Sequence, residues 1–93
     1  MQFQLTDHAR ARLQQRGIPM PILDCLLEFG SSIHDHRGCE IVFFDHDARA
    51  RLRRTYGEAR FKQFETKLAT YAVVGTDGVV ITVGHRTKRI NRH

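Results

Sequence analysis

The sequence predicts an α+β fold in which two N-terminal helices pack on a four-stranded antiparallel sheet, with an extra Arg-rich helix between the two hairpins. Two segments near the N-terminus carry helix start and stop signals. Two pairs of short apolar segments, each joined by a glycine-containing turn, indicate two hairpins. Because the first helices precede the paired strands, helices are expected to cover one face of the sheet. A length of 93 residues suits a single domain, 1–93, with one modest core.

The first predicted helix covers residues 6–16. Thr6 can cap its N-terminus, Asp7 lies at the positive end of the helix dipole, and Gly17 stands where a left-handed C-cap is expected. Two sets of residues recur at every fourth position and therefore form neighbouring stripes along this helix. The apolar stripe is formed by Leu5, Ala9 and Leu13, and the polar stripe is formed by His8, Arg12 and Arg16.

A second helix is predicted over Met20–Phe29, with a proline in its first turn and Gly30 at its stop. The first hairpin follows, with strands over 32–36 and 39–44 and a turn at Arg37-Gly38. These elements supply apolar side chains for one common core.

The Arg-rich helix is predicted to start after Asp45, which can cap it, and to stop at Gly57. The next segment, 58–67, is open between a helix and an extended arm. The second hairpin pairs 68–74 with 79–84 through the turn Asp77-Gly78, and the basic tail 86–93 is expected to leave the sheet.

The composition indicates a globular, basic protein. Hydrophobic residues make up 41% and charged residues 27%, and the formal net charge is +5. Twelve of the 15 basic residues are Arg, whose planar fork binds phosphate and carboxylate, so RNA or an acidic protein is the expected partner. No apolar run approaches the ~20 residues of a membrane helix and no signal peptide is recognised, so the expected location is the cytoplasm. Cys25 and Cys39 are expected to be reduced thiols.

The polar stripe of the first helix is the first candidate site. His8 is a proton-transfer group in line with two permanent cations, Arg12 and Arg16, which is the set of groups that phosphate chemistry needs. The alternative is a surface-exposed histidine on a charged helix.

The end of the last strand is the second candidate site. His85 would be a second proton-transfer group, and Arg86 and Lys88 could stabilise charge on a phosphoryl group, with Arg89 as a further phosphate contact. Strict alternation puts His85 on the face of Val79, Ile81 and Val83 and Arg86 on the opposite face. If the first face is the core, His85 is a buried structural histidine instead.

The pair His34-x-His36 could point two rings to one side of a strand and hold a metal. No His-x-x-x-His or Cys-x-x-Cys pattern accompanies this pair, so a solvated turn is favoured and neither a metal nor a cofactor is expected.

The Arg-rich helix is a candidate RNA-binding surface through Arg51, Arg53 and Arg54. The alternative is an ordinary charged helix face. Its segment Ala48–Leu52 repeats the Ala-Arg-Ala-Arg-Leu of 9–13. Asp47 stands in the position of His8, and Thr55 in the position of Arg16, so this helix has the charge without the titratable group.

The chain carries two motifs, His8-Ala9-x-x-Arg12-x-x-x-Arg16-Gly17-Ile18 near its start and Asp77-Gly78-Val79-Val80-Ile81-Thr82-Val83-Gly84-His85-Arg86 near its end. With both, it resembles a small bacterial family of unknown function whose hallmark is an opening Thr-x-His-Ala-x-x-Arg helix followed by Arg-Gly-Ile. That family is similar to the RelE-like ribonuclease toxins, within the wider barnase, EndoU and colicin nuclease group. The matched site positions are His8, Arg12, Arg16, His85 and Arg86.

The resemblance implies two N-terminal helices against a four-stranded antiparallel sheet, RNA cleavage without a metal, and an antitoxin partner. The Arg-rich helix after Phe44 departs from the minimal RelE-like plan. The leading hypothesis is a metal-independent endoribonuclease. One histidine would deprotonate the ribose 2′-hydroxyl, the other would protonate the leaving 5′-oxygen, and Arg12, Arg86 and Lys88 would hold the phosphate. The alternatives are a non-catalytic module that binds nucleic acid or protein through its arginines, and a toxin that acts on a protein target.

Overall fold

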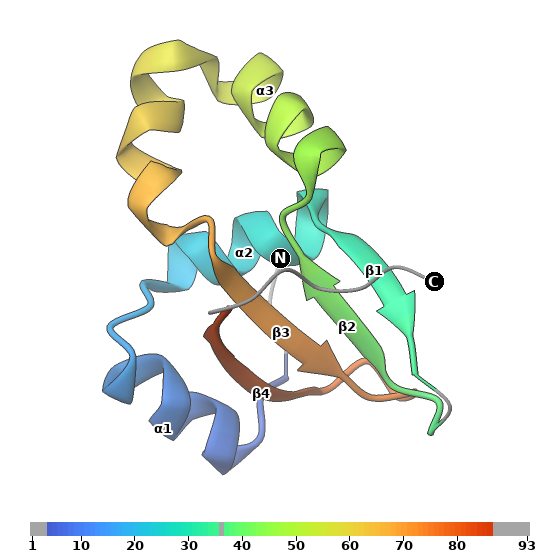
Figure 1. Ribbon diagram of the computed structural model, residues 1–93. Helices are drawn as coiled ribbons and strands as arrows, with labels where there is room; N and C mark the ends of the chain where they lie inside the picture. The colour runs from blue at the N-terminus through green and yellow to red at the C-terminus, as the bar shows by residue number, and fades with distance from the viewer. Residues whose placement is uncertain (1–3, 36, 87–93) are drawn as a thin grey trace.

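The computed structural model describes residues 4–35 and 37–86 (Figure 1). The elements are α1 (Asp7–Gln15), α2 (Met20–Phe29), β1 (Ser31–His34), β2 (Glu40–Phe43), α3 (His46–Phe64), the 3-10 turn η1 (Glu65–Lys67), β3 (Thr70–Val74) and β4 (Val80–His85). The strands form one antiparallel sheet in the order β1-β2-β3-β4. This is the predicted α+β fold, with α3 between the two hairpins. No helix in the described part of the chain is long and apolar enough to cross a membrane.

The boundaries of α1 follow from the capping residues that the sequence predicts. The Thr6 hydroxyl accepts a hydrogen bond from the Ala9 amide at 3.0 Å, which satisfies one free amide of the first turn. At the other end Gly17 has a φ of 62°, and the Ile18 amide donates to the Leu13 carbonyl at 2.9 Å. This hydrogen bond, with that from Gly17 to Gln14, forms a Schellman motif that ends the helix.

The predicted stop of the Arg-rich helix at Gly57 is a kink within α3. Gly57 has φ 83° and ψ 168°, a conformation that breaks the helix and that only glycine adopts easily. Beyond it the segment left open by the sequence is helical to Phe64. Tyr56 explains why the chain turns back: its ring lies edge-to-face between Phe29 at 6.0 Å and Phe64 at 5.7 Å. These aromatic contacts hold both halves of α3 against α2.

The core lies between the sheet and the helices, and in Figure 1 α2 lies behind the sheet while α1 lies next to β4. Its apolar side chains come from every helix and from β2, β3 and β4. The largest fully buried apolar side chains in this cluster are Leu23, Leu26, Phe44, Leu52, Leu68, Val80 and Val83. The sheet therefore has one face covered by helices and a second face on which Phe43 and Tyr71 are neighbours.

A bulge in β4 changes which residues share a face. Val73 pairs with Thr82 but Val74 pairs with Val80, so Ile81 is the extra residue. Val80 is consequently buried, whereas Ile81 is 38% exposed. Strict alternation would place Ile81 rather than Val80 on the core face, and this expectation is wrong because the bulge interrupts the two-residue period.

The segment that leads into α1 is hydrogen-bonded to the free edge of β4. Leu5 forms a parallel bridge with Val80, and the Thr6 amide donates to the Val80 carbonyl at 3.0 Å. The Thr6 hydroxyl also donates to the Ile81 carbonyl at 2.8 Å. These hydrogen bonds fix the start of α1 at the start of β4, so the helix runs along the strand in the same direction.

Candidate functional site

The packing of α1 along β4 brings the N-terminal and C-terminal motifs together. The Arg12 Nε donates to the Val83 carbonyl at 3.3 Å. One turn further along the helix, the His85 ring lies with its Nε2 3.1 Å from the Arg16 carbonyl. The Arg12 side chain and the Arg16 backbone therefore contact the last residues of β4, about 70 positions further along the chain.

The contact with Arg16 determines how the His85 ring can act. A carbonyl oxygen only accepts hydrogen bonds, so Nε2 carries the proton in this contact. The neutral ring then has its lone pair on Nδ1, the arrangement of a general base. His85 pairs with the fully buried Thr70 on the helix-covered face, and its own side chain is only partly buried. The ring thus combines a fixed orientation with access to solvent.

His8 is exposed in the first turn of α1 and lies away from His85. Eight residues separate it from Arg16, which corresponds to about 12 Å along the helix axis. Arg12 lies between the two ends of the stripe. The two histidines thus lie near opposite ends of one helix, and the RNA would have to extend along α1 to contact both.

Arg86 lies on the other side of the sheet from His85. Its Nη2 donates to the Phe44 carbonyl at 3.3 Å, and its guanidinium is 5.5 Å from the centre of the Phe43 ring. Arg49 donates to the same carbonyl at 3.4 Å. Burial, together with the like charge of Arg49, lowers the pKa of Arg86. These contacts join β4 to the start of α3, and they do not bring Arg86 to the His85 ring.

The arginines of α3 make contacts within the fold. Arg51 Nη2 donates to the Phe29 carbonyl at 2.8 Å, where it satisfies the C-terminal end of α2. Arg53 pairs with Glu58 at 2.9 Å and lies 4.4 Å from the centre of the Phe61 ring. The side chain of Arg54 is exposed and makes no hydrogen bond or ion pair within residues 4–35 and 37–86. The predicted RNA-contact residues Lys88 and Arg89 lie outside the described residues.

Tyr71 is a candidate site residue that was not found in the sequence. A Cβ atom placed on Gly84 would lie 3.0 Å from the Tyr71 Cε1 and 3.1 Å from its hydroxyl oxygen. The ring of Tyr71 therefore extends from β3 across the backbone of β4, on the face opposite the helices, and its hydroxyl lies against the residue before His85. The available signal was Gly84 itself, because glycine inside a strand often marks the close approach of another group.

The residues considered for metal binding and thiol chemistry have other roles. No group of three His, Cys, Asp or Glu side chains in the described part of the chain is arranged to hold a metal ion. The ring of His34 instead pairs with Glu40 across the first hairpin at 3.0 Å, and His36 lies outside the described residues. Both cysteines are free thiols, and burial raises the pKa of the Cys25 thiol, which makes it a poor nucleophile.

Comparison of the chain with family models, with curated proteins and with solved structures gives no match. The function must therefore be inferred from the site. The fold and site define a small basic α+β protein in which one histidine is oriented by the backbone at the end of an arginine-bearing helix.

Proposed function

We propose that the protein is an endoribonuclease that cleaves RNA by attack of a ribose 2′-hydroxyl on the adjacent phosphate. The observation that carries this proposal is the contact of the His85 ring with the Arg16 carbonyl, because it fixes an oriented base at the end of the helix that carries Arg12 and Arg16. Such a site can supply proton transfer and charge stabilisation from side chains alone.

In the proposed reaction, Nδ1 of His85 accepts the proton of the 2′-hydroxyl. The 2′-oxygen then forms a bond to phosphorus while the bond from phosphorus to the 5′-oxygen breaks. The products are a 2′,3′-cyclic phosphate and a free 5′-hydroxyl. Arg16 and the remaining donors of Arg12 bind the non-bridging oxygens and stabilise their growing charge.

The leaving 5′-oxygen takes its proton from solvent water, because the contact of His85 with α1 is open to solvent. Tyr71 lies on the opposite face of the sheet, at Gly84, and His8 lies at the far end of the α1 stripe, so neither is placed to protonate the same phosphate. A single RNA strand laid along α1 would place successive phosphates near Arg16, Arg12 and His8. Tyr71→Phe and His8→Ala should therefore leave the basic limb of the pH profile for kcat unchanged, because neither side chain acts as the acid.

The test is cleavage of a defined RNA by the purified protein in the presence of EDTA, with analysis of the product ends. Fragments that carry 2′,3′-cyclic phosphate and that are absent with His85→Ala support the proposal. RNA that stays intact over the whole pH range in which the protein is folded contradicts it. Salt-dependent binding of RNA without cleavage would favour the non-catalytic module, and reversal of charge at Arg54 would then weaken the binding.

A further inference from the structure

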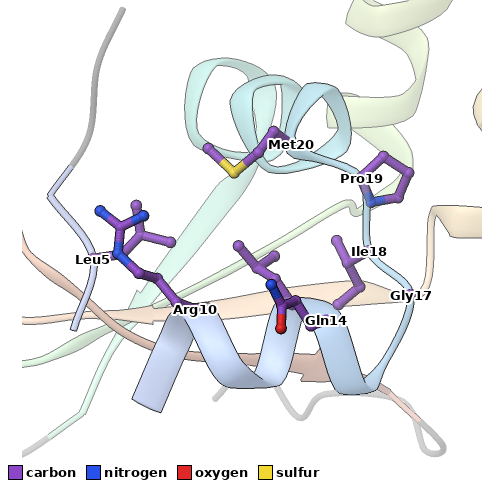
Figure 2. A pocket seen from close by; sticks show the side chains of 8 residues that line it. Leu5, Arg10, Gln14, Gly17, Ile18, Pro19 and Met20 are labelled. Atoms are coloured by element: carbon purple, nitrogen blue, oxygen red, sulfur yellow. The ribbon is translucent and has the colours of Figure 1, made fainter. Parts of the chain in front are cut away.

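A groove of about 510 Å³ opens between α1 and α2, on a side of the molecule that the proposed reaction does not use. Figure 2 shows side chains of both helices and of the segment before α1 around it. Its walls combine apolar and polar side chains, from Leu5, Arg10, Leu13, Gln14, Ile18 and Met20.

The apolar part of the groove is open to solvent. Leu13 and Ile18 form its floor and are only 7% and 5% exposed, since they also belong to the core. Met20 extends from α2 toward α1 in Figure 2 and is 46% exposed, the largest value among the exposed large hydrophobic side chains of the described residues. A flexible thioether at such a position adapts readily to an aliphatic partner.

The polar part of the groove carries one unpaired cation. The side chain of Arg10 is exposed and makes no hydrogen bond or ion pair within the described part of the chain. In Figure 2 its guanidinium lies beside Leu5 at one end of the groove, and Gln14 lies further along the same helix. Arg49, the matching residue of α3, instead donates to the Phe44 and Leu68 carbonyls at 3.4 Å.

The groove and the candidate RNA site lie on different faces of α1. Residues two apart on a helix point about 200° away from each other, so Arg10 faces away from Arg12. Gln14 and Arg16 diverge in the same way. An occupant of the groove can therefore bind without displacing RNA from the stripe.

We propose that this groove binds an acidic amphipathic segment of a partner protein. An aliphatic side chain of the segment would contact Met20, Leu13 and Ile18, and a neighbouring carboxylate would pair with Arg10. Charge complementarity supports this occupant, because the chain has a formal net charge of +5 and Arg10 lacks a partner within the described residues. One arginine beside apolar walls suits a carboxylate on an aliphatic stem, whereas a nucleic acid needs several cations along its backbone.

The experiment is selection of a random peptide library, displayed on phage, against the immobilised full chain. Selected peptides are then synthesised and their binding is measured by fluorescence anisotropy. We expect enriched peptides to combine Leu, Ile or Met with Glu or Asp. Met20→Gln and Arg10→Glu should each weaken their binding by about tenfold, as expected for central contacts of a small interface.

Arg54→Glu is the matched control, because it makes the same change of net charge at another exposed arginine that has no partner within the described residues. It should change the affinity by less than about twofold, since a distant surface charge acts on binding only through a screened field. A peptide in which Lys replaces the key acidic residue should bind Arg10→Glu better than the original chain. Circular dichroism of each variant checks the fold, which these exposed side chains should not alter.

Four outcomes would overturn the proposal. Three of them are the absence of enriched peptides, enriched peptides without acidic residues, and enriched peptides whose affinity does not change with Met20→Gln or Arg10→Glu. Competition by RNA for the same peptides would also overturn it, because the binding surface would then lie on the other face of α1. None of these measurements depends on RNA cleavage, so the proposal stands or falls separately from the nuclease function.

Discussion

Two helices of this protein contain the same five residues, and the folded chain uses them in partly different ways. In α1 and in α3 the first Ala and the Leu of Ala-Arg-Ala-Arg-Leu face the core, with Ala9, Ala48 and Leu52 fully buried and Leu13 nearly so. The second arginine of each copy donates to a carbonyl of a neighbouring element, Val83 in one case and Phe29 in the other. The shared sequence thus produces a shared way of packing.

The difference lies in the first arginine and in the flanking residues. Arg10 lies without a partner, among the described residues, at the rim of a groove, whereas Arg49 is hydrogen-bonded to two carbonyls. Thr55 follows the second copy at the position that corresponds to Arg16, and its hydroxyl donates to the Arg51 carbonyl of the same helix. The comparison teaches that a local motif sets which face of a helix is buried. The contacts of its polar side chains depend on the element that packs beside the helix.

The largest expected effect is on kcat, and it distinguishes His85, which contacts α1, from His46, which starts α3. His85→Ala should lower kcat for RNA cleavage by about 10²–10⁴-fold, the usual range for loss of a general acid or base. His46→Ala, at the exposed start of α3, should leave kcat unchanged. Initial rates with a fluorogenic RNA measure both. Equal losses of kcat in the two variants would contradict the proposed role of His85 as the general base.

Truncation of the two buried leucines should sharpen the comparison of packing. Leu52→Ala and Leu13→Ala should each reduce the free energy of unfolding by about 2–5 kcal/mol, and Leu52→Ala should be the more costly change. The reason is that Leu52 is fully buried whereas Leu13 is 7% exposed beside the groove. Urea denaturation followed by circular dichroism measures the difference. A larger loss for Leu13→Ala would contradict this ranking.

The second arginines should have equal structural effects and unequal functional ones. Arg12→Ala and Arg51→Ala each remove one hydrogen bond to a carbonyl, so each should lower the stability by about 1 kcal/mol. Only Arg12→Ala should also lower kcat, by about 10²-fold, since it alone binds the phosphate in the proposed site. If Arg51→Ala lowers kcat by the same factor, the charge of the whole surface matters rather than the position of Arg12.

The last comparison concerns the glycines that interrupt or end the two helices. Gly17→Ala should cost about 1 kcal/mol, because φ 62° at a helix end is a left-handed conformation that alanine adopts with modest strain. Gly57→Ala should cost more, up to about 3 kcal/mol, because φ 83° with ψ 168° is nearly restricted to glycine. A Cβ atom added to either glycine would meet no atom of another element within 4 Å, so collisions with neighbours do not confuse the result. Thermal unfolding curves give the order.

Much of the fold was predictable because its signals are local. Pro19 and Gly30 bracket α2, Thr6 and Gly17 bracket α1, and the turn at Asp77-Gly78 joins β3 to β4. The local sequence beyond Gly57 does not distinguish a helix from an extended arm, because the helix there is stabilised by the contacts of Tyr56 with Phe29 and Phe64. These contacts form only when α3 packs against α2. The bulge at Ile81 escaped prediction for the same reason, since it depends on the pairing partner of β4.

The candidate site was predictable as a set of residue types rather than as an arrangement. The four-residue spacing of His8, Arg12 and Arg16 shows that they share a helix face, but nothing in it shows that β4 lies beside that face. The approach of Tyr71 to Gly84 likewise depends on strand pairing. Arg86 shows the opposite case: adjacent to His85 in sequence, it lies on the other side of the sheet, because neighbouring strand residues point in opposite directions.

The hydrogen bonds that fix the start of α1 also limit how copies of this protein can join. On the outer edge of β4, Thr6 and Arg12 occupy the carbonyls of Val80 and Val83. The sheet therefore keeps a single open edge, at β1, in the described part of the chain. Two molecules joined through β1 would form a closed antiparallel pair with no second edge for further growth. Edge-to-edge pairing of the sheets should consequently end at a dimer rather than lead to fibres.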